Sequence, residues 1–245
     1  MKKRLLIASL LLLPLFLLSC IYVTKLRDVV EMNCYDIFHQ NAYVSSKKEI
    51  EQILSSFEVA TLDQLPKKYL EHSQLSSKKY ASLVQSLKFY KISKTDCYRK
   101  IVGNNRILNL ISKDSKYNKT WYFSTDTLYW GIDKSILFKV IELQDILSKK
   151  GYNRDGFDIR SGHRTPMYNT KIGGASKSRH IKGQAIDMTI GDINRDGVFT
   201  KEDKEIVLDI CEKQVIKNKG GIGLYPGTRS VHIDVRGYRA RWNSY

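Results

Sequence analysis

The chain has 245 residues, of which 42% are hydrophobic, so it can bury the core of one large domain or of one domain with an extension, and its globular composition excludes an unfolded polar chain. A formal charge of +16 favours polyanionic partners but selects none of them, because nucleic acid, anionic lipid and acidic cell-wall polymers are all negative. Which of these polyanions is the partner therefore depends on the cellular location of the protein.

The first twenty residues predict export. Met1 to Arg4 is positively charged, and Leu5 to Phe16 is an apolar run with the length of a signal-peptide core, short for a membrane span. Leu17 to Cys20 resembles the bacterial lipobox, which implies removal of residues 1–19 and lipidation of Cys20. The alternative is an ordinary signal peptide with an incidental cysteine. Both place the protein in the cell envelope, where peptidoglycan and the membrane surface are the expected partners and nucleic acid is not.

Residues 20–125 are predicted to form a tether followed by a mainly helical region. Ser46 and Glu49 form a capping box ahead of apolar residues at helical spacing. A second helical pattern begins near Ser77, and Pro66 separates the two helices or kinks their connection. No motif that carries chemistry occurs in this part of the chain.

Three cysteines follow Cys20, namely Cys34, Cys97 and Cys211. Export permits a disulfide, and an odd number leaves at least one thiol without an internal partner. Cys34 with Cys97 is the expected pair, because Cys211 lies on the apolar face of a predicted helix. Their spacing does not fit a zinc finger, so no structural metal is assigned to them.

Residues 126–245 predict a separate α+β domain. Asp133 is the expected N-cap of a helix that ends at Gly151. Because strands and helices follow without a regular βαβ repeat, a small mixed or antiparallel sheet with flanking helices is expected. The other elements expected in this domain are strands at 157–160 and 188–190, a helix over 202–217, and two strands at 220–225 and 230–235.

His180, Asp187 and His232 form a ligand set typical of catalytic zinc. They supply two imidazoles and one carboxylate, which leaves one position of the metal open. The two-residue period of the last strand puts His232 and Asp234 on the face opposite Val231 and its apolar neighbours. Either histidine alone would be read as an ordinary surface or core residue. The combination is what indicates a metal site.

Three segments surround these residues: Ser161-Gly-His-Arg-Thr-Pro, Ser178-Arg-His-Ile-Lys-Gly-Gln-Ala-Ile-Asp187, and Gly220-Gly-Ile-Gly-Leu-Tyr-Pro followed by Val231-His-Ile-Asp234. Together they resemble the zinc D-alanyl-D-alanine carboxypeptidase family, which includes D,D-dipeptidases and peptidoglycan endopeptidases. The resemblance implies that His180, Asp187 and His232 bind zinc. It also implies that Arg164 faces the substrate and holds a carboxylate or the carbonyl oxygen on which charge develops.

A hydrolase of this kind needs a general base beside its metal-bound water. Many relatives have an acidic residue three positions before the last histidine ligand, where this chain has Arg229. Asp234 is the candidate for the base or for a partner of His232, and His163 is the weaker candidate. The leading prediction is a zinc peptidase that cuts next to D-amino acids in peptidoglycan stem peptides. The departure at Arg229 keeps open a non-catalytic zinc-binding lipoprotein that binds peptidoglycan or a partner.

A second ion site is predicted in residues 192–203. Asp192, Asn194 and Asp196 supply oxygens at positions 1, 3 and 5 of an EF-hand-like calcium loop, with a glycine at position 6 and the carbonyl of Val198 at position 7. Asp203 stands at position 12 in place of the usual glutamate, as in the dockerin variety. The alternative is a polar turn that caps the following helix.

Overall fold

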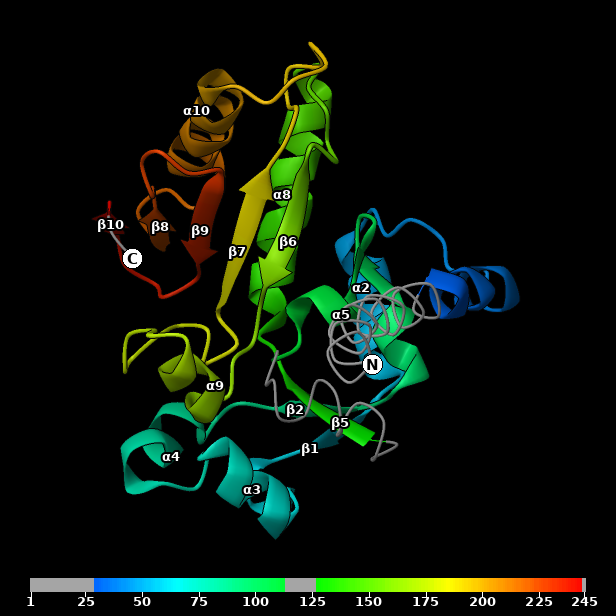
Figure 1. The fold of residues 1–245 in the computed structure, drawn as a ribbon, viewed down its shortest axis with the longest axis vertical. Coiled ribbons are helices and arrows are strands. Elements are labelled where there is room, and N and C mark those ends of the chain that lie inside the picture. Colours follow the sequence, from blue (N-terminus) through cyan, green and yellow to red (C-terminus); the bar gives the residue numbers. More distant parts are fainter. Residues whose placement is uncertain (1–28, 113–126, 244–245) are drawn as a thin grey trace, which may run out of the picture. The chain divides into compact units, whose positions relative to one another are not determined.

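The computed structural model describes residues 29–112 and 127–243 of the chain (Figure 1). Its two compact units are residues 1–42 and residues 43–245. In the first unit, residues 29–38 are helical. The predicted signal peptide, with Cys20, lies outside the described residues. Across the two described ranges, no helix combines the length and the hydropathy needed to cross a lipid bilayer.

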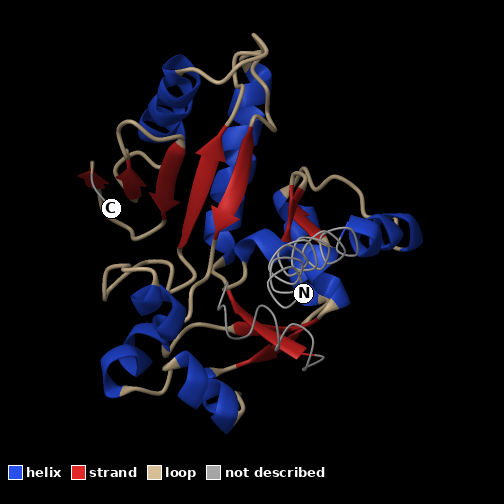
Figure 2. Cartoon of the chain, viewed as in Figure 1, coloured by secondary structure: helices blue, strands red, loops and turns tan. Residues whose placement is uncertain are grey.

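The second unit combines short helices with small sheets, which confirms the α+β class (Figure 2). Its helices are α2 (Lys47–Ser55), α3 (Lys67–Ser73), α4 (Lys78–Val84), α5 (Ile107–Leu110), α8 (Lys134–Lys149), α9 (Pro166–Lys171) and α10 (Lys201–Ile210), with a π-helical turn at Cys211–Val215. Its strands are β1 (Glu58–Ala60), β2 (Phe89–Ser93), β3 (Lys100–Val102), β4 (Asn105–Arg106), β5 (Thr127–Gly131), β6 (Phe157–Ser161), β7 (Ala185–Ile190), β8 (Gly221–Gly223), β9 (Ser230–Asp234) and β10 (Ala240–Trp242).

The largest sheet has the strand order β10-β8-β9-β7-β6. Its pairs are antiparallel except for β10 with β8, which are parallel. The smaller sheets are β1-β2-β5 and the hairpin β3-β4. The expected strand near 188–190 begins earlier, at Ala185, and β10 was not predicted. The mixed sheet of the sequence prediction is therefore confirmed, with one additional edge strand.

Helix α8 covers one face of the five-stranded sheet (Figure 1). The Asp133 side chain accepts a hydrogen bond from Ser135 N at 3.0 Å, which satisfies one of the free N–H groups of the first turn. Gly151, at φ +80°, follows the C-cap and supplies a left-handed conformation that a side chain would disfavour. The predicted helix is thus confirmed at both ends. Its buried face consists of Ile136, Leu137, Val140, Ile141, Leu143 and Leu147.

Strands from both sides of residue 126 pair with each other. Phe89 of β2 lies opposite Gly131 of β5, and the two strands run antiparallel. A second hydrophobic cluster joins α4 and β2 to Ile181, which is fully buried and follows His180 directly. The N-terminal part of this unit therefore supports the turn that carries His180.

The local elements differ from the sequence predictions in three places. The helix expected over 202–217 is α-helical only to Ile210, because the π-helical turn replaces its last part. Helix α3 was missed and begins directly after Pro66, whose fixed φ suits a helix start. The expected disulfide is not formed: Cys34 is exposed, while the fully buried Cys97 donates from Sγ to Ser93 O at 3.7 Å.

Candidate metal centre

The antiparallel pairing of β7 with β9 places Asp187 directly opposite His232. Val231 and Ile233 are fully buried, so the alternation along β9 turns His232 to the other face of the sheet. His180 reaches the same place from the turn before β7. Its carbonyl accepts hydrogen bonds from Arg164 N and Gly183 N, both at 3.1 Å, and these bonds fix the turn.

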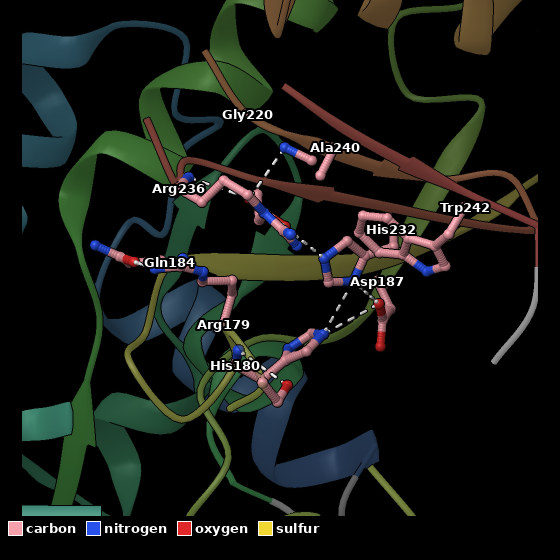
Figure 3. A network of polar contacts seen from close by, with 12 residues as sticks. Arg179, His180, Gln184, Asp187, Gly220, His232, Arg236, Ala240 and Trp242 are labelled. Carbon is pink, nitrogen blue, oxygen red and sulfur yellow. Dashed lines mark hydrogen bonds and ion pairs between the residues drawn. The ribbon is translucent and has the colours of Figure 1, made fainter. Parts of the chain in front are cut away.

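Three ligand atoms converge at this point, and Figure 3 shows His180, Asp187 and His232 directed toward one another. Asp187 Oδ1 lies 3.1 Å from His180 Nε2 and 2.8 Å from His232 Nδ1, and the two nitrogens are 3.2 Å apart. Ligand atoms about 2.0 Å from one tetrahedral zinc ion are about 3.3 Å from each other. The spacing and the donor set therefore fit zinc. Within the described ranges this is the one close group of histidine, cysteine and acidic ligands.

The hydrogen bond at the ring nitrogen that does not face the metal site sets the tautomer of each imidazole. His180 Nδ1 donates to Gly162 O at 2.6 Å, which leaves the lone pair of Nε2 for a metal. His232 Nε2 donates to Asp234 Oδ2 at 3.2 Å, which leaves Nδ1 as the ligand atom. The two histidines thus present different ring nitrogens, and a partner on the opposite nitrogen holds each ring in place.

The charges of the three ligands are set by burial and by each other. Burial alone would raise the pKa of Asp187, but His180 and His232 outweigh it and hold that pKa well below its usual range. Burial lowers the pKa of His180. Burial also acts to lower the pKa of His232, but its hydrogen bonds to Asp187 and Asp234 outweigh burial and raise it. Asp187 is therefore anionic and His180 neutral near pH 7, as a metal site requires.

Arg164 lies beside the carboxylate ligand. Its guanidinium forms an ion pair with Asp187 Oδ2, the oxygen that does not contact the histidines, and its Nε donates to Ser161 Oγ at 2.8 Å. The side chain is 13% exposed. Arg164 thus lies next to a proposed metal ligand, and its contact with the substrate stays a prediction.

Asp234 lies on the far side of the His232 ring from the other two ligands. Its carboxylate is fully buried, accepts from Gly221 N at 3.0 Å, and receives Arg236 Nε at 2.8 Å and Nη2 at 2.5 Å. Burial would raise its pKa, but His232 and Arg236 outweigh burial and keep the pKa well below the usual range. A side chain at position 221 would collide with this carboxylate, which requires glycine there. Of the two roles predicted for Asp234, this geometry fits the partner of His232.

His163 is fully buried. Burial, with a smaller contribution from His180, lowers its pKa to about 3, so its imidazole is neutral. Its Nδ1 accepts from Gly131 N at 3.4 Å, and its ring packs edge-on against Phe89 with centroids 5.9 Å apart. These contacts belong to the β2–β5 core, so the structure gives no support to His163 as a general base.

The sequence patterns did not predict the basic and aromatic side chains that lie beside the site. The Trp242 ring lies 5.1 Å from the His232 ring, and the Arg236 guanidinium is 5.0 Å from the Trp242 ring (Figure 3). Arg179 Nη2 donates to the Tyr238 hydroxyl at 3.2 Å. The available signal was the dense run of arginines and aromatics from 236 to 242, directly after the last predicted ligand.

The predicted calcium ligands are engaged with backbone N–H groups. Asp192 accepts from Arg195 N at 2.7 Å and from Gly197 N at 3.0 Å. Asp203 is fully buried, and its two oxygens accept from the backbone N–H groups of Ile193, Asn194 and Thr200 at 2.6 to 3.0 Å. Together with Thr200 it forms the capping box of α10. The geometry therefore supports the alternative, a polar turn that caps a helix, and does not support the calcium site.

A comparison with protein families gives one result that agrees with the ligand geometry. Residues 124–234 match the model of the Peptidase M15 family. The matched segment contains all three converging ligands and Arg164, and it supports a zinc-dependent metallopeptidase. Neither the curated proteins nor the solved structures contain a match to the chain.

Proposed function

We propose that the protein is an exported zinc peptidase that hydrolyses peptide bonds next to D-amino acids in peptidoglycan stem peptides. The observation that carries the proposal is the convergence of His180 Nε2, Asp187 Oδ1 and His232 Nδ1 inside the M15 segment. Zinc bound by these atoms supplies a Lewis acid and a water with a pKa near 7. The substrate and the cleaved bond are inferred from the family resemblance.

The surrounding residues have separate tasks in this proposal. Arg164 leaves one or more guanidinium N–H groups for the substrate, where its fork can bind a terminal carboxylate or the oxygen on which negative charge develops. Asp234 positions His232 through the Nε2 hydrogen bond, and Arg236 holds Asp234 in turn. His163 contributes packing.

The proposed location is the bacterial cell envelope. It depends on the N-terminal signal and on lipidation of Cys20, which would fix the protein to a membrane and bring it near the cell wall. Removal of residues 1–19 takes away Lys2, Lys3 and Arg4, so the net charge falls from +16 to about +13 (16 − 3), which still fits an anionic envelope. Nucleic acid has no part in the proposal.

A non-catalytic zinc-binding lipoprotein is the second candidate function, and two observations favour it. Asp234 contacts His232 from the side away from Asp187. Arg229, which stands where many relatives have an acid, lies over the Phe199 ring at 4.2 Å. The acid expected beside the metal-bound water is therefore not supplied by either position.

A calcium ion in the 192–203 loop stays a separate prediction from the sequence. The peptidase proposal does not need it, because the hydrogen bonds of Asp192 and Asp203 already close the loop.

The test is hydrolysis of defined muropeptides by the full chain, purified in detergent and loaded with zinc. Mass spectrometry should detect loss of D-alanine or cleavage of a cross-link, and a chelator should abolish it. His232→Ala is the matched variant and should lose both zinc and product. A folded, zinc-loaded protein that releases no product would reject the peptidase and favour the binding lipoprotein.

A further inference from the structure

A hollow of about 380 Å³ lies between the end of α4, the start of β2 and the turn that follows His180. It is separate from the three metal ligands, none of which lines it. The lining residues come partly from outside the M15 segment. They are Leu83, Ser86, Leu87, Lys88, Tyr90, Ile132, Asp133, Lys134, Lys182 and Gln184.

The charged side chains that line the hollow carry a net positive charge. Lys134 is paired with Glu51 at 2.6 Å. Asp133 caps α8 through Ser135 N and accepts from Gln184 Nε2 at 3.5 Å. Lys88 and Lys182 have no ion-pair partner among the described residues, and both side chains are at least partly exposed. Lys88, Lys134 and Lys182 outnumber Asp133 and Glu51, so the hollow has a net positive charge and presents the two ammonium groups of Lys88 and Lys182 to a ligand.

A second hollow of about 350 Å³ adjoins the first, since Lys88, Tyr90 and Lys134 line both. Its other walls are mainly apolar and include Leu54, Phe57 and Val59, with Glu51 and Ser55 at the edge. The two hollows together form an elongated groove, which we call the lysine groove. The apolar walls of the second hollow and the few separate lysines suit an extended peptide that carries carboxylates better than a polymer with a charge on every unit.

The lysine groove and the metal centre share the turn over residues 180–184. Gln184 Oε1 accepts from Arg179 Nη1 at 3.2 Å, and Arg179 Nη2 donates to the Tyr238 hydroxyl. Figure 3 shows Gln184 and Arg179 to one side of His180 and His232. Asp133 N donates to Gly183 O at 2.9 Å, which fastens the turn after His180 to the start of α8. One short turn thus carries a metal ligand at His180 and a wall of the groove at Lys182 and Gln184.

We propose that the lysine groove is a second substrate subsite, which binds the carboxylate-bearing part of a stem peptide while another part lies at the metal centre. The inference rests on the proposed peptidase function for the identity of the peptide. Lys88 and Lys182 pair with its carboxylates, and Tyr90 and Gln184 offer hydrogen bonds to its backbone. Because Lys88 and Tyr90 precede residue 124, the N-terminal part of the chain supplies a specificity that the M15 segment lacks.

Binding is measured first on the full chain in detergent, with the metal removed so that no turnover occurs. The probe is a fluorescein-labelled stem peptide with free carboxylates, compared with the same peptide fully amidated. The double variant Lys88→Ala with Lys182→Ala should raise the Kd of the carboxylate peptide by about three- to tenfold at low salt, as expected for exposed charge pairs. Lys150→Ala is the matched control, because this exposed lysine lies at the other end of α8.

Three results of the binding experiment would overturn the proposed subsite. An unchanged Kd in the double variant, or an equal loss for the amidated peptide, overturns the subsite. The subsite is also overturned if a glycerol-phosphate oligomer shows the lysine dependence and the stem peptide does not. Near-ultraviolet circular dichroism of the variants must match that of the unchanged chain, which shows that they are folded. Lys88→Glu is a second variant, at an exposed position.

Hydrolysis assays with two substrates test the lysine groove and the peptidase activity separately. A short capped substrate with neutral groups cannot reach the lysines, so its kcat/KM should be equal in the double variant and the unchanged chain, while kcat/KM for the long acidic peptide falls. If the unchanged chain cuts neither substrate but binds the acidic peptide through Lys88 and Lys182, the peptidase fails and the groove stands. If both substrates are cut equally by all variants, the groove fails and the peptidase stands.

Discussion

Asp187 and His232 face each other across adjacent antiparallel strands, and Asp187 Oδ1 lies 2.8 Å from His232 Nδ1. The register of β7 with β9 sets this contact, so two ligands of the proposed zinc site are positioned by a hydrogen-bonded ladder. Only His180 depends on a turn. A site built mainly on sheet strands holds its ligands with little freedom, which favours a defined metal geometry.

Asp234→Asn is expected to weaken zinc binding by about 10- to 100-fold, the usual effect of removing a charged partner from a histidine ligand. The amide cannot accept the His232 Nε2 proton and pair with Arg236 as the carboxylate does. Competition with a fluorescent zinc chelator measures the affinity. A general base would give a different result, since kcat would then collapse while zinc affinity stayed normal.

Arg236→Gln serves as the matched variant for this prediction. It removes the group behind Asp234 and leaves the His232 hydrogen bond in place. Zinc affinity should therefore fall less than in Asp234→Asn. Equal losses in both variants would show that general destabilisation of β9 explains the effect.

The metal-free protein is expected to be most stable near pH 6.5. The pKa of His232 is raised above its ordinary 6.5, so its contribution to stability is complete below pH 6.5 and is lost as the pH rises through the folded value. The pKa values of His163 and His180 are lowered from 6.5, so they are neutral in the fold and cost stability as the pH falls below 6.5. Melting temperatures from pH 4.5 to 8.5 give the profile.

Zinc affinity follows a different course with pH. It should fall steadily on acidification, beginning above pH 6.5, because a proton on His232 competes with the metal. His163→Gln should flatten the acid side of the metal-free melting profile and leave the zinc curve unchanged. A zinc affinity independent of pH between 5 and 8 would contradict the assigned ligand His232.

Sequence patterns predicted much of this molecule because the relevant signals are local. The capping box at Ser46 and Glu49, the ends of α8 and the period of β9 each depend on neighbouring residues, and all are confirmed. The ligand set followed from motif spacing. These features need no knowledge of which strands pair.

The missed features depend on tertiary contacts. Periodicity put Asp234 on the same face as His232 but could not show which nitrogen of the ring it bonds. Trp242 reaches His232 because β10 pairs in parallel with β8, and the β10 segment carries no clear strand pattern. The calcium motif predicted ligands by position, whereas Asp203 turns both oxygens to backbone donors.

Asp203→Ala is expected to destabilise the chain by about 2 kcal/mol, because it removes a helix cap and leaves buried N–H groups of Ile193 and Asn194 without an acceptor. That loss corresponds to a melting temperature lower by about 4 to 8 °C for a domain of this size. Asp209→Ala, an exposed acid on the same helix, should change it little. Added calcium should leave all three melting temperatures unchanged. If calcium raised the melting temperature of the unchanged chain and Asp203→Ala abolished that rise, the result would support the calcium site.

Ile181→Ala is expected to weaken zinc binding as well as the fold. Ile181 is fully buried in the cluster formed by α4, β2 and their neighbours, and it follows His180 directly. Truncation of a buried isoleucine costs about 2 to 5 kcal/mol, and the cavity would let the His180 turn shift. Ile193→Ala removes an equally buried side chain from the main core and should cost similar stability. Zinc affinity should fall clearly only in Ile181→Ala. The other buried members of the Ile181 cluster all precede residue 90. The same loss in both variants would therefore show that the N-terminal part of the unit stabilises the fold without positioning the metal ligand.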